Sequence, residues 1–357
     1  MIVHVFPAEK FTEGYIQQIC DNFCGGDHTF IVYGNNDKVR GKLQRFSDDT
    51  NIIYCSSPSR LLLSKKRLLT LARADKVVVH GIFSYSVILS LFLFIQKTLL
   101  VCWGGEIYEF RNEVKGIKEK CIRRYKKYYI NHVKWIATLV QGDFDVLKQW
   151  CSPKGEHYLV QYSSAHSANE EREKIRNLDK PSNPVYILVG NSAAKDNNHI
   201  KSLQLLSRFS NENIEIIVPL SYGGPEDYVE SVIEVGKKLF GDKFVPIRSF
   251  MEISDYWSLL NKCKVGVFNN DRQQAMGNIN SMAILGAKVY IRSDTVMWNE
   301  FVNMQGMNYF DIEEINNEDF NQFWGYSIEQ ANENYRIRKE AGSVERFVER
   351  WSTVFNL

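Results

Sequence analysis

Short apolar runs alternate with longer amphipathic stretches through the first half of the chain. Each run has four or five residues and is rich in β-branched side chains, as expected of strands buried in a parallel sheet. Stretches with helical spacing separate the runs. The runs are residues 2–6, 29–33, 52–55, 77–80 and 99–103, and the clearest helical stretches are 15–23 and 60–71. This alternation predicts a parallel sheet wrapped by helices, which is a Rossmann-like architecture.

The alternation restarts after a polar segment near the middle of the chain. Residues 163–183 carry little apolar material, and Pro181 and Pro184 close the segment, which is typical of a linker. Beyond it the predicted strands are residues 185–189, 214–219, 244–247, 265–268 and 289–291, and the predicted helices are 198–209, 226–240, 253–261 and 278–285. The sequence therefore predicts a second Rossmann-like half.

The expected domain organisation has four parts. These are an α/β domain at 1–165, a linker at 166–184, a second α/β domain at 185–325 and a helical segment at 326–357 that packs across both. A chain of 357 residues supports two domains, because a single core stops growing at roughly 250 to 300 residues. Two such halves are expected to face each other across a cleft, with ligands at the carboxyl ends of the strands.

Composition narrows the class of protein. A chain with 44% hydrophobic and 24% charged residues is typical of a soluble or peripheral globular protein, and a net charge of +2 gives no overall attraction to nucleic acid. The seven cysteines are scattered and lack a Cys-x-x-Cys pair, although Cys20 and Cys24 lie one helical turn apart. We expect reduced thiols in a cytoplasmic protein. Residues 1–7 predict a first strand rather than a signal peptide.

One segment is strongly basic. Residues 115–134 contain eight Lys or Arg and one acidic residue, with Tyr125, Tyr128 and Tyr129 among them. A basic, aromatic helix suits an anionic membrane surface with its tyrosines at headgroup level, although a solvated helix face fits the same pattern. The most apolar stretch, 82–95, is shorter than the roughly 20 residues that span a bilayer, and predicts a buried helix.

The loop after the first strand of the second half is a candidate anion site. Gly190 permits a tight turn, Asn191 and Ser192 follow it, and a helix begins near Asn198. Free backbone N–H groups and the helix dipole favour a diphosphate at such a place. An ordinary strand-to-helix turn with Asn and Ser as caps is the alternative.

A second polar loop follows the strand at 265–268. Its Arg272 offers a fork of donors suited to phosphate, while Gln273 and Gln274 can bond sugar hydroxyls or an acetamido group. Gly277, next to Asn278, would let the backbone approach a ligand. The alternative is a solvated loop whose arginine pairs with a surface carboxylate. The function is favoured because both loops lie at the same edge of one predicted sheet.

Candidate acid–base residues lie in the first half. The motif at 102–109 follows an apolar strand and places Glu106 and then Glu109 where a cleft carboxylate could deprotonate an acceptor hydroxyl. Either residue could instead charge the first turn of a helix. His80, at the end of another strand, is a third candidate. Asp143 and Asp145 form an Asp-x-Asp triplet, but Asp143 is placed as a helix N-cap, so no metal is expected there.

Several of these motifs together resemble glycosyltransferase family 56. They are ILVGNS at 187–192, NHI at 198–200, WGGEIYE at 103–109, VPLSY at 218–222 and RQQAMG at 272–277. The resemblance implies a GT-B fold with two Rossmann-like domains, and a TDP-sugar donor held by the second half, with Tyr222 among its contacts. It further implies an undecaprenyl-diphosphate-linked saccharide as acceptor and a peripheral position at the cytoplasmic face of the bacterial inner membrane.

The leading hypothesis is therefore a glycosyltransferase that needs no metal or other cofactor. In it, the Gly190 and Arg272 loops hold the donor, a TDP-linked 4-acetamido-4,6-dideoxyhexose, and Glu106 activates the acceptor hydroxyl. A nucleotide-sugar epimerase or phosphorylase of the same fold is one alternative. A non-catalytic, membrane-associated protein that binds nucleotide sugars is another.

Overall fold

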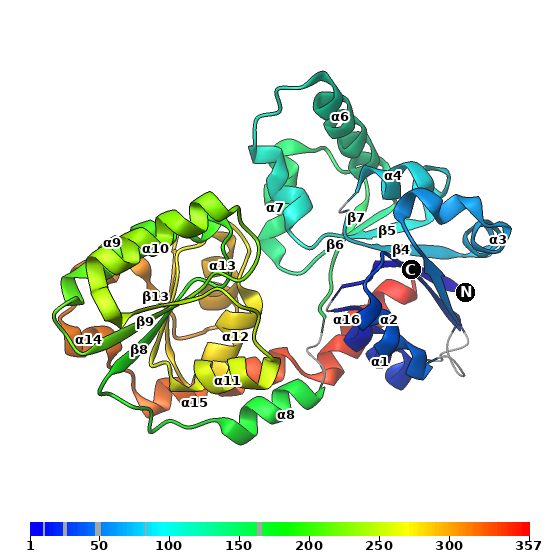
Figure 1. Cartoon of the computed structure of the whole chain (residues 1–357). Helices are drawn as coiled ribbons and strands as arrows, with labels where there is room; N and C mark the ends of the chain where they lie inside the picture. Colours follow the sequence, from blue (N-terminus) through cyan, green and yellow to red (C-terminus); the bar gives the residue numbers. More distant parts are fainter. Residues whose placement is uncertain (10, 24–26, 47–50, 83, 163–165) are drawn as a thin grey trace. The chain divides into compact units, whose positions relative to one another are not determined.

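The computed structural model describes residues 1–9, 11–23, 27–46, 51–82, 84–162 and 166–357. These residues form two compact units (Figure 1). The first comprises Met1–His166 and Ser343–Leu357, and the second comprises Ser167–Gly342. Each unit contains one parallel sheet with helices on both faces.

The sheet of the first unit has seven strands in the order β3-β2-β1-β4-β5-β6-β7. The strands are β1 (Ile2–Pro7), β2 (His28–Tyr33), β3 (Asn51–Cys55), β4 (Lys76–His80), β5 (Thr98–Val101), β6 (Trp135–Thr138) and β7 (Glu156–Leu159). The helices are α1 (Thr12–Asn22), α2 (Asp37–Leu43), α3 (Lys65–Arg73), α4 (Tyr85–Leu91), α5 (Gly105–Tyr108), α6 (Ile117–His132), α7 (Gln141–Trp150) and α16 (Val344–Phe355), with short 3-10 helices η2 (Gln44–Phe46), η3 (Pro58–Leu63), η4 (Phe92–Lys97) and η5 (Glu109–Arg111). Helices α1, α2 and α16 cover one face of this sheet in Figure 1.

The sheet of the second unit has six parallel strands in the order β10-β9-β8-β11-β12-β13. The strands are β8 (Val185–Val189), β9 (Ile214–Pro219), β10 (Phe244–Ile247), β11 (Val265–Phe268), β12 (Lys288–Ile291) and β13 (Phe310–Asp311). The helices are α8 (His166–Ile175), α9 (His199–Leu206), α10 (Glu226–Phe240), α11 (Ile253–Lys262), α12 (Met276–Ile284), α13 (Val296–Trp298), α14 (Phe320–Trp324) and α15 (Ile328–Ala341), joined by a π-helix at Asn299–Met304 and 3-10 turns at Lys195–Asn197, Ser207–Phe209, Gly241–Lys243 and Ile312–Asn316. Helices α9, α10 and α14 pack on one face of the sheet, and α11 and α12 pack on the other.

The segment expected to be a linker differs from that expectation. It contains α8, in which the Arg172 side chain is buried and Nη1 donates to Ser281 Oγ at 2.9 Å. The guanidinium carbon also lies 5.4 Å from the ring centre of Trp257. An arginine can bury its stem and still find a polar partner, so a polar composition alone does not reveal that a segment is packed. Residues 163–165 lie outside the described part.

The C-terminal segment is two helices rather than one. Helix α15 belongs to the second unit, and α16 returns to the first unit after a break at Gly342 and Ser343. The Ser343 side chain accepts a hydrogen bond from the Arg346 backbone N–H at 3.2 Å, which caps α16. Trp351 of α16 is fully buried in the core of the first unit, so this helix completes that core.

Two further expectations can be compared with the structure. The six described cysteines are free thiols, and Cys24 lies outside the described residues. Across the part of the chain that is described, no helix combines the length and the apolar character needed to cross a bilayer. The apolar stretch at 82–95 was expected to be a buried helix. It contains α4 and most of η4 and is only partly buried, because Leu89 and Leu93 are exposed.

Candidate donor site and acidic turn

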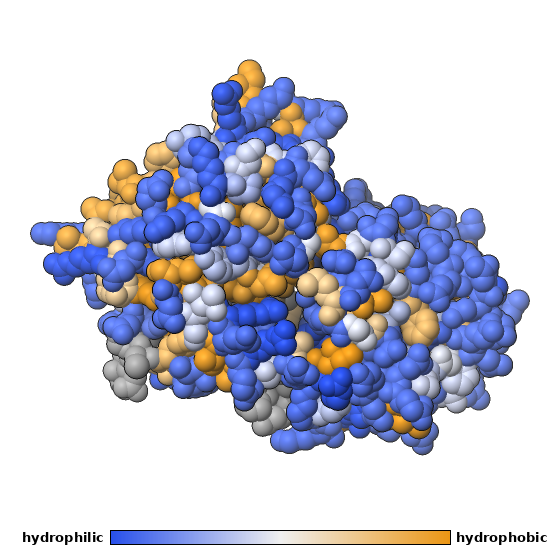
Figure 2. All heavy atoms as spheres, turned by 180° about the vertical axis from the view of Figure 1, so that it is seen from behind, coloured by the Kyte–Doolittle hydropathy of each residue, from blue (hydrophilic) through white to orange (hydrophobic). Residues whose placement is uncertain are grey.

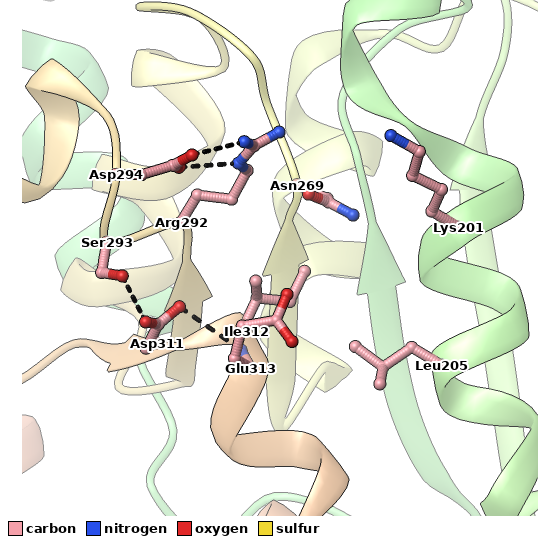
Figure 3. A pocket seen from close by; sticks show the side chains of 9 residues that line it. All are labelled: Lys201, Leu205, Asn269, Arg292, Ser293, Asp294, Asp311, Ile312 and Glu313. Carbon is pink, nitrogen blue, oxygen red and sulfur yellow. Dashed lines mark hydrogen bonds and ion pairs between the residues drawn. The ribbon is translucent and has the colours of Figure 1, made fainter.

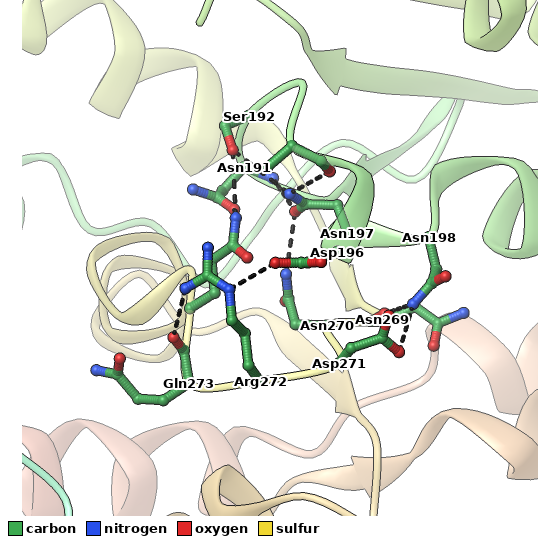
Figure 4. A network of polar contacts seen from close by, with 12 residues as sticks. Asn191, Ser192, Asp196, Asn197, Asn198, Asn269, Asn270, Asp271, Arg272 and Gln273 are labelled. Carbon is green, nitrogen blue, oxygen red and sulfur yellow. Dashed lines mark hydrogen bonds and ion pairs between the residues drawn. The ribbon is translucent and has the colours of Figure 1, made fainter. Parts of the chain in front are cut away.

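The carboxyl ends of β8 and β11 meet at the switch point of the second sheet. From β8 the chain crosses to β9 on one side and later returns as β11 on the other side, so the loops after β8 and β11 diverge. We name them the 190 loop (residues 190–198) and the 270 loop (residues 269–275). Figure 4 shows that their polar side chains point toward one another. The two candidate loops of the sequence therefore belong to one site.

Asn197 ties the two loops together. Its side chain is fully buried, and its Oδ1 accepts hydrogen bonds from the Asn191 backbone N–H and from Asn270 Nδ2, both at 3.1 Å. Its Nδ2 donates to the Ala194 carbonyl oxygen at 3.1 Å and lies 3.4 Å from Ser192 Oγ. One amide thus uses its acceptor and donor sides at once. Its removal would leave buried polar groups unpaired, at a cost of about 1–3 kcal/mol each.

Asn198 makes a second bridge. Its φ of +50° lies in the left-handed region, which Asn adopts more readily than most residues. In this conformation its Nδ2 donates to the Asn269 carbonyl oxygen at 2.9 Å and to Asp271 Oδ1 at 2.8 Å. The backbone N–H of Asp271 donates in turn to the Asp196 carbonyl oxygen at 3.0 Å. The 270 loop is therefore held by backbone and side-chain bonds together.

Arg272 is positioned by an acidic partner within the site. Its Nε donates to Asp196 Oδ2 at 2.6 Å, and Nη1 donates to the Gln273 carbonyl oxygen at 3.3 Å. The sequence left open a phosphate ligand or an ion pair, and the structure shows an ion pair with a residue of the facing loop. Nη2 has no hydrogen-bond partner among the described residues, and the side chain is 23% exposed. One edge of the guanidinium therefore stays available to an anion.

Unpaired polar atoms gather at the same place. Gln274 Nε2 lies 3.4 Å from both Asn191 Oδ1 and Ser192 Oγ, whereas its Oε1 has no partner within the described ranges. The same holds for Asn270 Oδ1 and for Nε2 of the buried His199. Because buried polar groups normally find partners, these atoms are suited to a polar ligand. Gln273 is only 5% exposed, so little of its side chain lies at the surface.

Close packing explains the glycine at the start of the 190 loop. Gly190 has a φ of +71°, and a Cβ at this position would lie 2.7 Å from His199 Nε2 and 3.0 Å from Asn197 Oδ1. Tyr222, from the loop after β9, packs beside it: the Tyr222 carbonyl accepts the Ala193 N–H at 2.7 Å, and its hydroxyl accepts from Asn191 Nδ2 at 3.4 Å. Three strand ends thus contribute to the site.

The 270 loop leads into the N-terminus of α12. Ala275, with a φ of +60°, precedes the helix, and such a conformation costs a non-glycine residue on the order of 1 kcal/mol or more. A Cβ on Gly277 would meet no atom within 4 Å, so the space beside the first turn is open. Asn278 Nδ2 donates to the Tyr256 hydroxyl of α11 at 2.7 Å. Backbone N–H groups at such a helix start favour an anion.

A cavity of about 450 Å³ lies beside Asn269, the first residue of the 270 loop (Figure 3). Its lining comes from α9 and from the ends of β11, β12 and β13, and comprises Lys201, Leu205, Asn269, Arg292, Ser293, Asp294, Asp311, Ile312 and Glu313. Arg292 is held there by Asp271 at 2.5 Å and by Asp294 at 2.6 Å, and the hydrogen bond from Arg292 to Asp294 lowers the pKa of Asp294. The carboxylates that line this cavity disfavour a diphosphate. The available guanidinium edge of Arg272 suits a diphosphate better.

In the first unit, Glu106 lies in a sharp turn after β5. Gly104, with a φ of +97°, turns the chain into α5, and Glu106 in the first turn of that helix is almost fully buried. Its Oε1 accepts the Trp103 backbone N–H at 3.0 Å, and its Oε2 has no hydrogen-bond partner among the described side chains and backbone. Burial raises the pKa of Glu106, although backbone N–H bonds and Lys126 oppose the rise. Glu106 therefore lies in the first turn of a helix and also has a raised pKa, so the structure is compatible with both interpretations of the sequence.

The other two acid–base candidates have different surroundings. Glu109, in η5, pairs through Oε1 with Lys126 Nζ at 2.5 Å and is partly exposed. His80 is fully buried, and its two ring nitrogens bond to His4 and Tyr162. Neither arrangement resembles the unpaired buried carboxyl oxygen of Glu106.

The Asp-x-Asp triplet also differs from its expectation in detail. Helix α7 begins at Gln141, so Asp143 is its third residue and not its N-cap. The Asp143 side chain is buried, and its Oδ1 accepts a hydrogen bond from the Tyr108 hydroxyl at 2.7 Å. This contact ties α7 to α5, the helix that carries Glu106, and supports a structural role.

Four residues that shape the donor site did not stand out in the sequence: Asp196, Asn197, Asn270 and, in its bridging role, Asn198. The available signal was the run of short polar residues between the end of β8 and the start of α9, and again after β11. Such runs are also ordinary in loops. Their partners in the other loop are more than 70 positions away in the chain, which spacing alone cannot show.

Comparison with known proteins agrees with this geometry. The profile of a family described as 4-alpha-L-fucosyltransferase, glycosyl transferase group 56, matches residues 27–325. Among solved structures, Anabaena HepE in complex with UDP is 11% identical, with a TM-score of 0.70 over 100% of both chains. A glycosyltransferase from Rickettsia africae is 14% identical, with a TM-score of 0.65 over 99% of this chain and 97% of that chain. The trehalose 6-phosphate synthase of Burkholderia multivorans is 6% identical, with a TM-score of 0.66 over 99% and 96%.

Two parallel α/β units with this likeness define a GT-B fold, which confirms the predicted fold class. The family match identifies a glycosyltransferase and confirms the predicted enzyme class. Because the family profile spans most of the chain, the protein belongs to glycosyl transferase group 56.

Proposed function

We propose that the protein transfers a 4-acetamido-4,6-dideoxyhexose such as Fuc4NAc from a TDP-linked donor to an undecaprenyl-diphosphate-linked saccharide. The acceptor would belong to the synthesis of a bacterial surface polysaccharide, such as enterobacterial common antigen or an O-antigen. The observation that carries the donor half is the polar network between the 190 and 270 loops. A family described by fucosyl transfer supports a deoxyhexose, and UDP bound to HepE supports a pyrimidine nucleoside diphosphate.

In this proposal the second unit holds the donor. The diphosphate binds the N–H groups at the start of α12, the free edge of Arg272, and the Asn191 and Ser192 side chains. Gln274, with its unpaired Oε1, contacts the sugar together with Gln273. We expect these groups to balance the diphosphate charge without a metal or other cofactor.

The first unit supplies the base. The acceptor hydroxyl oxygen forms a bond to the anomeric carbon of the donor, and the bond from that carbon to TDP breaks with its electron pair leaving on TDP. The hydroxyl proton passes to the Glu106 carboxylate. A carboxyl whose pKa is raised by burial holds such a proton better than an ordinary one.

A mixed apolar and basic surface on the first unit supports a position at an anionic membrane. Helix α6 packs beside α4 and η4, and the Phe92 ring stacks on Tyr125 at 5.5 Å. Leu93 on η4 is 76% exposed and Ile117 on α6 is 83% exposed. We name this the α4–α6 surface. Its other exposed apolar residues are Leu63, Leu89 and Tyr128, and its exposed cations include Lys118, Lys120, Arg124 and Lys127. Figure 2 shows hydrophobic patches among hydrophilic ones on the part of the first unit to which these helices belong.

This surface corrects one detail of the sequence interpretation. Tyr129 is fully buried, and Lys126 is buried against Glu109, so neither can face lipid headgroups. Besides Ile117 and Tyr128 of the basic helix, the apolar contribution comes from α4, η3 and η4, which precede that helix. Exposed leucines flanked by cations are typical of surfaces that enter the headgroup region of anionic bilayers.

The central test of the proposal is transfer itself. Purified protein is expected to move the labelled sugar from TDP-Fuc4NAc to a lipid-linked saccharide, with far less transfer from the UDP-linked sugar, and with activity unchanged by EDTA. The readout is label in the lipid fraction. Turnover of donor without lipid acceptor would favour an epimerase or phosphorylase instead. Absence of transfer with every TDP-sugar offered would contradict the proposal.

Membrane association is tested by vesicle sedimentation. The double variant Leu93→Ser, Ile117→Ser is expected to bind phosphatidylglycerol-containing vesicles at least tenfold more weakly, because full burial of each large apolar side chain is worth roughly 1.5–3 kcal/mol. The matched control is Phe250→Ser, since Phe250 is 78% exposed on the second unit. Binding should also weaken with salt. Equal losses in both variants, or equal binding to neutral vesicles, would contradict the assignment.

A further inference from the structure

Three buried histidines form a line across the sheet of the first unit. They are His28 on β2, His4 on β1 and His80 on β4, which are neighbouring strands, and we name them the histidine row. His4 Nε2 lies 3.0 Å from His28 Nδ1, and His4 Nδ1 lies 3.2 Å from His80 Nε2. His28 begins β2 and His80 ends β4, so the row runs diagonally from the amino edge of the sheet to its carboxyl edge.

The row continues to the turn that carries Glu106. His80 Nδ1 lies 2.5 Å from the Tyr162 hydroxyl, and the Trp103 indole Nε1–H donates to the same hydroxyl oxygen at 2.8 Å. The backbone N–H of Trp103 donates to Glu106 Oε1 at 3.0 Å. Trp103 therefore links the histidine row to the proposed base, through its indole N–H on one side and its backbone N–H on the other.

The hydrogen bonds from Trp103 through Tyr162 to the histidine row form one set, and they can all run in one direction. An indole N–H can only donate, so the Tyr162 oxygen accepts from Trp103, and its own proton is available to His80 Nδ1. A neutral imidazole carries one proton, so His80 holds its proton on Nε2 and donates to His4 Nδ1. By the same rule His4 donates from Nε2 to His28 Nδ1. All protons in the set point from Trp103 toward His28.

Burial keeps the rings neutral, as this pattern requires. Desolvation holds the pKa of His4 and of His80 well below the ordinary value and lowers that of His28 to about 4. The titratable groups that face the row are Tyr15 on α1, Tyr162, Asp27 before β2 and the amino terminus. The remaining neighbours, such as Phe30, Trp351 and Phe355, are apolar. A neutral, buried row suits fixed orientation and not proton conduction.

We propose that the histidine row, acting through Tyr162 and Trp103, positions the Glu106 carboxyl for transfer. His80 is then a positioning residue and not the acid or base. The proposal rests on the role of Glu106 in the proposed function, but the hydrogen-bond pattern of the row is independent of any substrate. Loss of the Tyr162 hydroxyl removes the partner shared by His80 and Trp103, while the ring stays in its aromatic packing.

The pattern is tested first by nitrogen-15 NMR of the histidine rings in the intact protein without ligand. His4, His28 and His80 are expected to carry the proton on Nε2 alone, with no change between pH 6 and 8. Half-buried His132 on α6, whose Nδ1 lies 2.8 Å from the Tyr128 carbonyl oxygen, gives the reference spectrum of a ring outside the row. A proton on Nδ1 of His80 or His4, or protonation of either ring in this range, would overturn the proposal. Because no donor or acceptor is used, failure of the proposed function leaves this result unaffected.

Kinetics test the link to Glu106. The Tyr162→Phe variant should lose about tenfold in kcat with an unchanged KM for the TDP-sugar, and the fixed tautomer of His80 should be lost. Tyr15→Phe is the matched control, because Tyr15 is a ring of the same aromatic cluster whose hydroxyl makes only a 3.4 Å contact with His4. Unchanged kcat in folded Tyr162→Phe, or equal losses in both variants, would overturn the positioning role. If Tyr162→Phe does not fold, the NMR result decides.

Discussion

The Gly190→Ala variant is expected to lose at least tenfold in affinity for TDP while keeping its overall fold. A Cβ at this position would approach His199 Nε2 to 2.7 Å and Asn197 Oδ1 to 3.0 Å, and the φ of +71° is unfavourable for alanine. The loop must shift, and the strained backbone costs about 1–3 kcal/mol of stability. Since Asn197 also holds the 270 loop, the shift reaches the Arg272 side of the site. Isothermal titration calorimetry with TDP and a thermal melt measure the two effects.

Gly277→Ala is the matched control for this variant. Gly277 follows the same kind of strand end, but its φ is not positive and a Cβ there meets nothing within 4 Å. It lies in the first turn of α12, where alanine is the better helix former by about 0.5–1 kcal/mol. Stability should therefore stay equal or rise. Because Gly277 lies in the turn proposed to bind the diphosphate, this control applies to stability alone. Equal loss of stability in both variants would show that backbone strain and crowding at Gly190 have no cost.

Glu106→Gln should lower kcat by about 10²–10⁴-fold, the range typical of a removed general base, with little change in donor affinity. In the parent protein, kcat/KM is expected to rise with pH through the pKa of Glu106, which burial places above the ordinary carboxyl value. This acidic limb should vanish in the variant. A rate profile across pH 4–9 for both proteins measures this. A parent-like limb in Glu106→Gln would assign the ionisation to another group.

Stability provides a second readout at this position. Because the folded-state pKa of Glu106 is raised, the folded protein holds the proton more tightly than the unfolded chain. The stability that this tighter proton binding contributes is present at low pH and is lost as pH rises through the folded-state pKa of Glu106. The neutral glutamine should therefore gain stability relative to the parent as pH rises. Glu109→Gln, which removes a partly exposed partner of Lys126, should change kcat little.

Much of the fold could be predicted because buried parallel strands are short, apolar and continuous. The ten predicted strands correspond to β1–β5 and β8–β12, with ends within two residues. Three strands were missed. Strand β6 follows the basic segment directly, β7 is a partly exposed edge strand with polar residues, and β13 has two residues. The sequence pattern is weak in each of these three strands. Each is defined instead by its hydrogen bonding to a neighbouring strand of the sheet.

The candidate site could be predicted only in part, for a physical reason. Strand ends are visible in the sequence, so the loops at Gly190 and Arg272 and the turn at Glu106 could be located. Their partners could not, because hydrogen bonds such as that of Arg272 with Asp196 join residues 76 positions apart. The histidine row was hidden in the same way, since His4 and His80 are brought together by strand order alone.

The return of α16 to the first unit affects the order of events during synthesis. The second unit is a continuous stretch, Ser167–Gly342, whereas the first lacks Phe347 and Trp351 until the ribosome has passed the whole second unit. The Trp351 indole N–H then donates to the Gln161 carbonyl oxygen at 2.9 Å. A nascent chain of the first 166 residues would expose the aromatic face around His4 and His80 to water. The unit whose synthesis begins first is therefore the unit whose core is completed last.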